Sequence, residues 1–499
     1  MTGNFIIRRM IVETEADLDM SLIFVYTESD FTEFIFSIEG SGSELFVART
    51  EELSKLSAAM KQTGCASLIY GKRRVGKTRL IKEALDRQDQ SVIYYECIKG
   101  TMQENIDAFT RLLADLQILS FSSLFRSFSD VFAYLNTLPR SFVVVIDEYP
   151  YLSSLADAEI VDSVFQTVID QKLSNIHLIL SGSQVSVMKN LLQKGNALYG
   201  RFRLILHLRE LDYQDAAMFY PSLSPYEKIA FYGVFGGSPF ILQELREKES
   251  LEQNMIRTIL DESSPVFLYA SNILLTDYSN AVNAERILAV LGNGKKKYSE
   301  LERALQANSN GSLAKQLNSL QATELIRRQF PINKPDDQKK KFYEINDNLL
   351  RFWYTYLHRS RSALQMVGPK AFFERHIAPT LLKDYVPRRF EELCRGFFSR
   401  QAKKGLLPGI TNIGTYYYDD PVHHRNGEFD IALEFGDHYQ IFEAKYYRKP
   451  MSLSEIHKEI GQIRDIGSLN VAQVGFIAVN GFEKQEDGFS YYSGEDLYR

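Results

Sequence analysis

The residues best suited to chemistry lie in a glycine-rich segment between an apolar stretch and a helical pattern. Residues 71–78 read GKRRVGKT, which satisfies the spacing G-x-x-x-x-G-K-[ST]. Glycines let the backbone curl so that its N–H groups face phosphate oxygens, and the helix N-terminus adds positive potential. Lys77 would then bridge the β- and γ-phosphates, and the Thr78 hydroxyl would reach Mg²⁺. The predicted nucleotide-binding residues are Gly71, Arg74, Val75, Gly76, Lys77, Thr78 and Arg79.

A second motif follows about 70 residues later in the chain, where the apolar run 142–146 ends in two carboxylates, Asp147 and Glu148. A strand buried on both faces must place its polar groups at its tip. Asp147 could hold the hydration shell of Mg²⁺, and Glu148 could polarise the attacking water in phosphoryl transfer. The alternative is a solvated strand end with incidental acids.

Two single residues are weaker candidates in the same region. Ser183 follows the next apolar run and could contact a γ-phosphate or the attacking water, although a polar turn without function would look the same. Arg201, in the segment LYGR, could neutralise charge that grows on a transferred phosphoryl group, as an arginine finger does. An ordinary surface arginine is the competing interpretation.

Acidic residues also gather in the C-terminal part, in a pattern typical of a β-hairpin over 428–446 with Gly436-Asp437 in its turn. Counting outward from that turn places Asp430 opposite Glu443, with Lys445 two residues further on the same face. Like charges across a sheet destabilise it, so the pair calls for a cation such as Mg²⁺. Solvated charges on an exposed hairpin, with Glu434 and Lys445 paired, are the alternative.

This Asp…Glu-x-Lys arrangement resembles the metal-dependent core of restriction-enzyme-like folds. In those folds the acids hold Mg²⁺ and the lysine orients or activates water. The resemblance adds Glu391, from the preceding predicted helix, as a third metal ligand beside Asp430 and Glu443. A degenerate domain of this type that only binds DNA is a further alternative.

The elements that must position these residues alternate between strands and helices. Helices at 50–61 and 78–86 and strands at 66–70, 91–97, 142–146 and 177–180 predict an α/β fold with a parallel sheet. Helices at 213–220, 225–234 and 239–251 follow as a small helical lid. Three helices from 280 to 320 and two strands at 325–330 and 341–345 match a winged helix-turn-helix. The predicted units are a 1–44 extension of unknown role, a 45–210 P-loop domain, a 211–270 lid, a 271–365 winged helix and a 366–499 C-terminal α/β domain.

The winged helix carries basic residues around its predicted wing, which are Arg327, Arg328, Lys334, Lys339, Lys340 and Lys341. Such a patch would bind phosphates in a salt-sensitive and mostly sequence-independent way. Winged helices in ATPases also serve as protein-docking or lid elements, and a charge run is commonly a solvated face. Both interpretations stay open.

Six segments together resemble the prokaryotic AAA-type ATPases related to STAND signalling NTPases. These segments are 46–53 (FVARTEEL), 70–78 (YGKRRVGKT), 145–152 (VIDEYPYL), 198–201 (LYGR), 236–239 (GGSP) and 343–354 (YEINDNLLRFWY). The resemblance covers the chain from about residue 45 and implies an ATP-dependent P-loop domain joined to a winged helix and a restriction-endonuclease-like domain. Ala48 departs from it, because the family usually places glycine there.

Composition limits the remaining choices. The net charge of -5 excludes coating of nucleic acid by bulk charge, and three dispersed cysteines give neither a disulfide framework nor a zinc cluster. With no apolar run long enough to cross a bilayer, we expect a cytoplasmic protein. The expected function is a Mg²⁺-dependent, ATP-hydrolysing regulator coupled to a DNA-directed, nuclease-like domain. The alternatives are a signalling switch that binds proteins through an inactive C-terminal domain, and an ATPase ring formed by copies of the chain.

Overall fold

The computed structural model of the 499-residue chain describes residues 8–12, 20–24, 47–119, 125–153, 158–277, 281–307, 311–420, 425–464 and 470–499. These residues fall into two compact units, Met1–Arg209 and Glu210–Arg499. Of the predicted extension 1–44, two strands are described, β1 (Arg8–Val12) and β2 (Met20–Phe24), which pair antiparallel; the rest lies outside the described residues. Among the described helices, none has both the length and the apolar character needed to cross a membrane.

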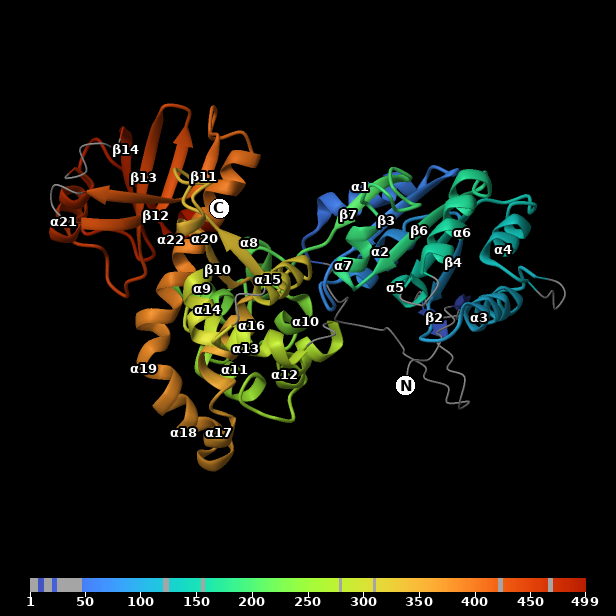
Figure 1. Cartoon of the computed structure of the whole chain (residues 1–499), viewed down its shortest axis with the longest axis horizontal. Helices are drawn as coiled ribbons and strands as arrows, with labels where there is room; N and C mark the ends of the chain where they lie inside the picture. The colour runs from blue at the N-terminus through green and yellow to red at the C-terminus, as the bar shows by residue number, and fades with distance from the viewer. Residues whose placement is uncertain are drawn as a thin grey trace. The chain divides into compact units, whose positions relative to one another are not determined.

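The first unit is built on a five-stranded parallel sheet in the order β4-β5-β6-β3-β7 (Figure 1). Its strands are β3 (Cys65–Tyr70), β4 (Ser91–Glu96), β5 (Phe142–Asp147), β6 (Ile176–Gly182) and β7 (Phe202–His207). The predicted parallel α/β sheet is thus confirmed. The edge strand β7 escaped prediction because its burial alternates instead of forming a continuous apolar core.

Helices cover both faces of this sheet. Helices α1 (Thr50–Met60) and α2 (Lys77–Leu85) pack on one face through Leu56, Leu80 and Ile81. Helices α3 (Met102–Asp115), α4 (Phe128–Leu135) and α6 (Ala158–Gln171) pack on the other. Strands β5 and β6 are buried along their whole length, as expected for central strands between two helical layers. Their polar groups therefore emerge at the carboxyl ends.

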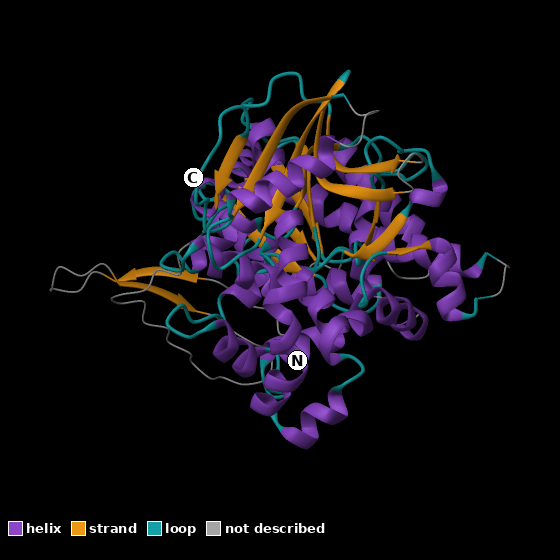
Figure 2. Cartoon of the chain, turned by 90° about the vertical axis from the view of Figure 1, so that its left-hand side faces the viewer, coloured by secondary structure: helices purple, strands orange, loops and turns teal. Residues whose placement is uncertain are grey.

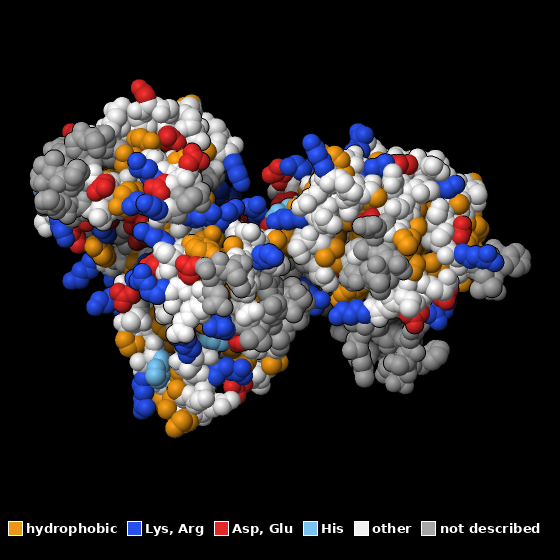
Figure 3. Space-filling view, in the orientation of Figure 1, with side chains coloured by type: hydrophobic (Ala, Val, Ile, Leu, Met, Phe, Trp, Pro, Cys, Tyr) orange, Lys and Arg blue, Asp and Glu red, His pale blue; other side chains and the backbone are white. Residues whose placement is uncertain are grey.

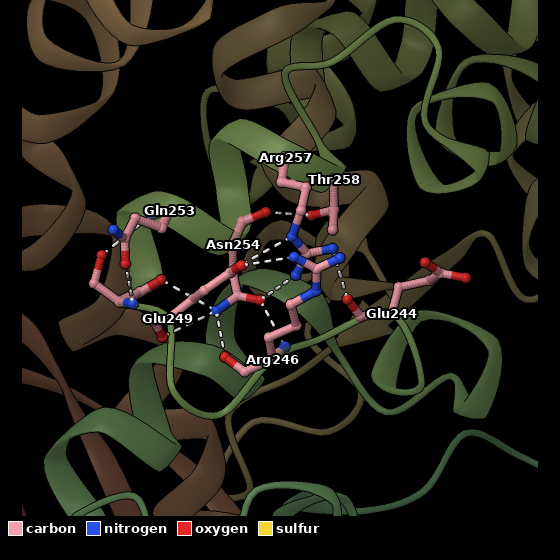
Figure 4. Close-up of polar contacts among 8 residues, drawn as sticks. Glu244, Arg246, Glu249, Gln253, Asn254, Arg257 and Thr258 are labelled. Atoms are coloured by element: carbon pink, nitrogen blue, oxygen red, sulfur yellow. Dashed lines mark hydrogen bonds and ion pairs between the residues drawn. The ribbon is translucent and has the colours of Figure 1, made fainter.

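The second unit begins with short helices, and here the predicted helix over 239–251 is wrong. Helix α10 (Pro239–Leu242) ends after one turn, and α11 (Leu251–Thr258) starts afresh with Ser250 as its cap. Asn254 holds the intervening loop (Figure 4), because its amide nitrogen donates to the carbonyls of Arg246 at 2.9 Å, Glu249 at 3.1 Å and Ser250 at 3.1 Å. A fully buried asparagine thus satisfies loop carbonyls that a continuous helix would have paired internally.

The winged helix-turn-helix of this unit follows the predicted order. Helices α13 (Ala281–Leu291), α14 (Tyr298–Leu305) and α15 (Ser312–Ala322) precede the antiparallel strands β9 (Ile326–Gln329) and β10 (Phe342–Ile345). The two-residue strand β8 (Lys296–Lys297) pairs with the other edge of β10. Long helical segments then lead to helix α20 (Val386–Lys403).

The C-terminal part is a mixed five-stranded sheet in the order β11-β12-β13-β14-β15, with α20 on the chain before it (Figures 1 and 2). Strands β11 (Asn412–Asp420), β12 (Arg425–Phe435) and β13 (His438–Lys445) are antiparallel, whereas β14 (Val471–Ala478) and β15 (Ser490–Ser493) run parallel to β13. Helix α21 (Leu453–Arg464) connects β13 to β14. Of the strands in this sheet the sequence predicted only the central hairpin, whose register, with Phe435 opposite His438, is confirmed. Helices predicted at 388–400 and 454–465 correspond to α20 and α21.

Candidate functional site

The glycine-rich segment forms a tight loop between β3 and α2. Gly71 has no room for a side chain, since an added Cβ would lie 2.0 Å from the Leu208 carbonyl oxygen. Arg74 and Gly76 have φ values of 66° and 92°, so the backbone turns through the left-handed region just before the helix begins. Such a turn directs successive N–H groups to one side, where the helix N-terminus adds its partial positive charge.

The Lys77 side chain is 6% exposed and lies back along this loop. Its ammonium donates to the carbonyl oxygens of Gly71 at 2.9 Å and Lys72 at 3.0 Å. The charge is thus held within the loop, while Arg74, Thr78 and Arg79 have exposed positions beside it.

The tip of β5 places its carboxylate against the start of α2. The Thr78 hydroxyl donates to Asp147 Oδ2 over 3.3 Å, and the Tyr94 hydroxyl donates to the same oxygen. Asp147 is 4% exposed. The pKa of Tyr94 is raised well above its ordinary value, first by the burial of the Tyr94 hydroxyl and second by the negative charge of Asp147. Tyr94 was missed by sequence reasoning, because only the pairing of β4 with β5 brings it to the carboxylate.

Glu148 turns away from the strand with φ of 50°, an uncommon conformation for a residue other than glycine. Its Oε2 accepts hydrogen bonds from the Ser183 amide at 3.2 Å and the Ser183 hydroxyl at 2.8 Å. Ser183, predicted to contact phosphate or water, therefore contacts the carboxylate that was predicted to polarise the water. Backbone strain of this kind is commonly found at functional sites.

A further residue that sequence reasoning missed supports the loop from behind. Arg49 donates from Nη2 to the Val75 carbonyl at 2.8 Å and to the Arg209 carbonyl at 2.6 Å. Ala48 and Arg49 have φ values of 64° and 58°. The left-handed backbone at Ala48 is the physical reason why glycine would suit this position better than alanine.

Arg201 is engaged within its own unit. Its guanidinium donates from Nε to Asp170 Oδ1 at 3.0 Å and from Nη2 to Asp170 Oδ2 at 3.0 Å, and Nη1 reaches the Ala197 carbonyl at 2.8 Å. An arginine finger in this geometry would first have to leave a bidentate ion pair. The local sequence around Arg201 does not predict this ion pair, because Asp170 lies 31 residues earlier in the chain.

The C-terminal carboxylates form a second candidate site. Strand pairing runs up to Ile431 opposite Phe442, which leaves Asp430 and Glu443 one step outward on adjacent strands. Lys445 Nζ contacts Glu443 Oε1 at 2.6 Å and Glu459 Oε1 at 3.0 Å. Glu434 instead accepts from the Tyr439 hydroxyl at 3.1 Å, so the alternative of a Glu434–Lys445 pair is not formed.

Electrostatics show that these acids affect one another. Burial, followed by the charge of Asp430, raises the pKa of Glu391 to about 8, while Arg395 opposes the rise. Burial also raises the pKa values of Asp430 and Glu443. The charges of Glu443 and Glu459 outweigh desolvation and raise the pKa of Lys445 above its ordinary value, so this lysine is a firmly charged group.

The spacing for a metal is less favourable. Within the described ranges, no three or more His, Cys, Asp and Glu side chains lie close enough together to form a metal-binding group. The structure thus brings Glu391, Asp430 and Glu443 within electrostatic reach of one another without arranging them as a finished three-carboxylate site.

The basic wing is smaller than the sequence suggested. Arg327 is not a surface cation, since its Nε donates to Glu344 Oε1 at 2.6 Å and its Nη2 pairs with Glu392. Lys340 lies over the Tyr417 ring at 3.4 Å from its centroid. Arg328, Lys334 and Lys339 are exposed. On the face drawn in Figure 3, blue basic and red acidic side chains are interspersed.

Comparison with known families identifies three segments of this chain. Residues 46–245 match a family described as an ATPase domain predominantly from Archaea. Residues 284–348 match an HxlR-like helix-turn-helix, and residues 353–459 match archaeal and bacterial proteins of unknown function. The chain therefore contains a P-loop ATPase domain followed by a winged helix.

The matches to individual proteins of similar sequence or structure span most of the length of those proteins. An uncharacterized protein of Methanocaldococcus jannaschii is 26% identical over 427 residues, which are 83% of this chain and 91% of that protein. A Walker-type ATPase of Pyrococcus abyssi is 19% identical with a TM-score of 0.48, covering 62% of this chain and 95% of that one. The ORC2 protein of Aeropyrum pernix is 12% identical with a TM-score of 0.42, covering 62% of this chain and 94% of that one.

Proposed function

We propose that this chain is a Mg²⁺-dependent ATPase that regulates a DNA-directed activity of its second unit. The observation that carries the proposal is the meeting of Thr78, Asp147 and Glu148 beside the glycine-rich loop. A hydroxyl and a buried carboxylate oxygen lie 3.3 Å apart there, and hard oxygen donors of this kind suit Mg²⁺. When bound, Mg²⁺ would neutralise charge on the phosphates during transfer.

The protein groups have separate tasks in this proposal. The loop amides and Lys77 bind the triphosphate of ATP, with Arg74 and Arg79 at its exposed side. Tyr94 and Thr78 fix the orientation of Asp147, while Glu148 accepts a proton from the attacking water. Ser183 positions Glu148, because one hydroxyl and one amide hydrogen bond hold its Oε2. Arg201 joins the reaction only if its pair with Asp170 opens.

DNA would be bound through the winged helix. Helix α15 buries Leu313, Leu317 and Leu320 and leaves the polar side chains of Ser312, Lys315, Asn318 and Ser319 exposed. A polar helix face of this kind can contact base edges and phosphates, and the exposed wing residues Arg328, Lys334 and Lys339 would add phosphate contacts. The lid over 211–270 would connect this module to the ATPase domain.

The test measures ATP hydrolysis and DNA binding on the same purified chain. ATP turnover with Mg²⁺ should fall at least a hundredfold in Lys77→Ala, because the ammonium that bridges the phosphates is removed. The exposed Lys61→Ala, in the same unit, is the matched control and should keep its rate. Lys315→Ala should weaken binding to duplex DNA without changing the basal ATPase rate. Absence of ATP binding in the wild type would sink the proposal.

A second candidate function is metal-dependent DNA cleavage at Asp430, Glu443 and Lys445. It is favoured by the position of Asp430 and Glu443 on adjacent strands with Glu391 within electrostatic reach, since a cation would offset both the burial and the mutual repulsion that raise the pKa of Glu391. Nicking that needs Mg²⁺, is lost in Asp430→Ala and persists in Lys77→Ala would support it. If no DNA or RNA is cut in any metal, the second unit acts as a DNA- or protein-binding switch.

The role of Arg201 depends on whether copies of the chain assemble. In the alternative of an ATPase ring, the arginine of one copy would act on the nucleotide of its neighbour. Light scattering with ATP bound tests this alternative, and a strictly monomeric protein would contradict it.

A further inference from the structure

The second unit contains a polar cavity of about 500 Å³ that the proposed function does not use. Its wall comes from four parts of the chain: the turn over 291–295 after α13, Glu344 of β10, the helical segments over 351–385, and the start of α20. The volume lies within the range of small-molecule sites, which are usually about 300 to 1,000 Å³. Residues separated by almost a hundred positions thus line one pocket that is open to solvent on one side.

The cavity wall is built from unusual backbone. Three π-helical segments contribute to it, η3 (Trp353–Leu357), η4 (Phe373–Ile377) and η5 (Leu381–Tyr385). π-Helical turns are rare and occur frequently at functional sites, because the wider turn displaces side chains from their regular helical positions. Three such turns around one cavity are a second observation, independent of its volume.

The charge of the lining is predominantly positive. Four cationic side chains, Lys295, Arg351, Arg388 and Arg389, face two carboxylates, Glu344 and Asp384. Arg351 is largely neutralised, since it contacts Glu392 at 3.2 Å and Glu344 at 3.8 Å. The remaining positive charge therefore resides mainly on the side formed by α20.

Two arginines line that side of the cavity. Arg388 is exposed and has no ion pair or hydrogen bond with any residue of the described ranges. Arg389 spends Nη1 on Glu392 at 3.1 Å, while its Nε is buried and has no hydrogen-bond partner among the described residues. This Nε is not reached from the cavity in the present side-chain conformation, so Arg388 is the main cation that a bound anion would meet, with the Arg389 guanidinium beside it.

The opposite wall offers room and neutral donors. Gly294 has φ of 104°, a backbone conformation that glycine adopts without strain. The Tyr356 and Thr380 hydroxyls share one hydrogen bond of 2.9 Å, which leaves one of their two protons for another acceptor. The Tyr385 and His376 rings complete the wall.

We propose that this cavity binds a phosphorylated small molecule of about mononucleotide size, held by the guanidinium groups of Arg388 and Arg389. Guanidinium groups match phosphate oxygens with paired N–H donors, and hydroxyls can satisfy the remaining oxygens. The site is separate from the glycine-rich loop, which lies in the other unit. Lys295 of the cavity wall also contacts Glu428 Oε2 at 2.6 Å. A ligand that displaces Lys295 would therefore change a contact of β12, the strand that carries Asp430.

The experiment uses the full chain with Lys77→Ala, so that the ATPase site does not contribute, and titrates inorganic pyrophosphate and AMP by calorimetry without metal. Saturable binding of either probe with one site per chain is expected. Arg388→Ala in the same background should weaken it at least tenfold. Arg375→Ala removes an exposed arginine of η4 outside the lining and should change affinity less than twofold.

Two results would overturn the proposal. One is the absence of saturable binding of both probes to a chain whose unfolding transition is intact. The other is an equal loss in Arg388→Ala and Arg375→Ala, which would show that only diffuse surface charge attracts the anions. A circular dichroism spectrum matching that of the parent variant confirms that each substituted chain is folded.

Discussion

Removing the hydroxyl of Ser183 should slow ATP hydrolysis without changing ATP affinity. The hydroxyl lies 2.8 Å from Glu148 Oε2, and the Ser183 amide at 3.2 Å remains in the variant. A hydrogen bond to a charged group is worth about 1.5 to 3 kcal/mol, and each 1.36 kcal/mol of barrier corresponds to a factor of about ten. Because one of the two bonds survives, we expect Ser183→Ala to lower kcat about tenfold.

The assay is single-turnover hydrolysis of radiolabelled ATP, followed for hours so that slow variants stay measurable. Ser181→Ala is the matched control, since this buried hydroxyl lies two residues earlier, on β6, and has no hydrogen-bond partner among the described residues. The decisive comparison is a double-mutant cycle with Glu148→Gln. If Ser183 acts by positioning Glu148, its loss has almost no further effect in that background. An undiminished tenfold loss there would refute the reasoning.

Three further predictions concern stability. Asn254→Ala should lower the free energy of unfolding of the second unit by about 3 kcal/mol, because the Glu249 carbonyl loses its donor and the Arg246 amide and the Arg257 guanidinium lose their acceptor; an unchanged urea midpoint would contradict this. Ala48→Gly should raise stability by about 1 kcal/mol, since glycine adopts the observed φ of 64° without strain, and a lower melting temperature would count against it. Burial lowers the pKa of His177 below its ordinary 6.5, so its contribution to stability is complete above that pH and decreases as pH falls below it. His177→Gln should therefore flatten the urea midpoint between pH 5 and 7, and a profile as steep as that of the wild type would exclude this histidine.

The parts of the fold that the sequence predicted are those set by local pattern. The apolar run that became β5 is buried at every position, and such a run predicts a central strand without knowledge of its neighbours. The hairpin register followed from the turn alone, because Gly436-Asp437 determines which residues face each other. The failed helix over 239–251 depended instead on Asn254, whose side chain reaches back to a loop and leaves no periodic signal.

The same holds for the candidate site: residues close together in the sequence were predicted, and contacts between distant residues were not. The loop over 71–78 is contiguous, so its spacing alone indicated its position. The partners of its chemical groups are not contiguous in sequence. Ser183, after the end of β6, contacts Glu148, after the end of the neighbouring strand β5, and Asp170 of α6 pairs with Arg201. Arg327 was counted among surface cations because its partner Glu392 lies 65 positions further along. Which charges remain available is a property of packing, and sequence pattern does not record it.

That buried ion-pair network also limits how the second unit can respond to nucleotide. Glu392 is contacted by Arg327 and Arg351 from the winged helix region and by Arg389 from α20. Desolvation alone would raise the pKa of Glu392, but the charges of the surrounding arginines outweigh it and lower that pKa to about 2. Removing one partner from a fully buried network costs about 3 to 5 kcal/mol, and the cost here is smaller because Arg327 is 32% and Glu392 25% exposed. Glu391, the neighbour of Glu392, belongs to the C-terminal carboxylate site. A shift of the winged helix away from α20 would break these pairs, so under the proposed function the winged helix and α20 would respond to nucleotide together. Glu392→Gln, which keeps the shape but removes the charge, should loosen this connection and increase hydrogen exchange in β9 and β10; unchanged exchange there would show that the apolar contacts alone hold the two parts together.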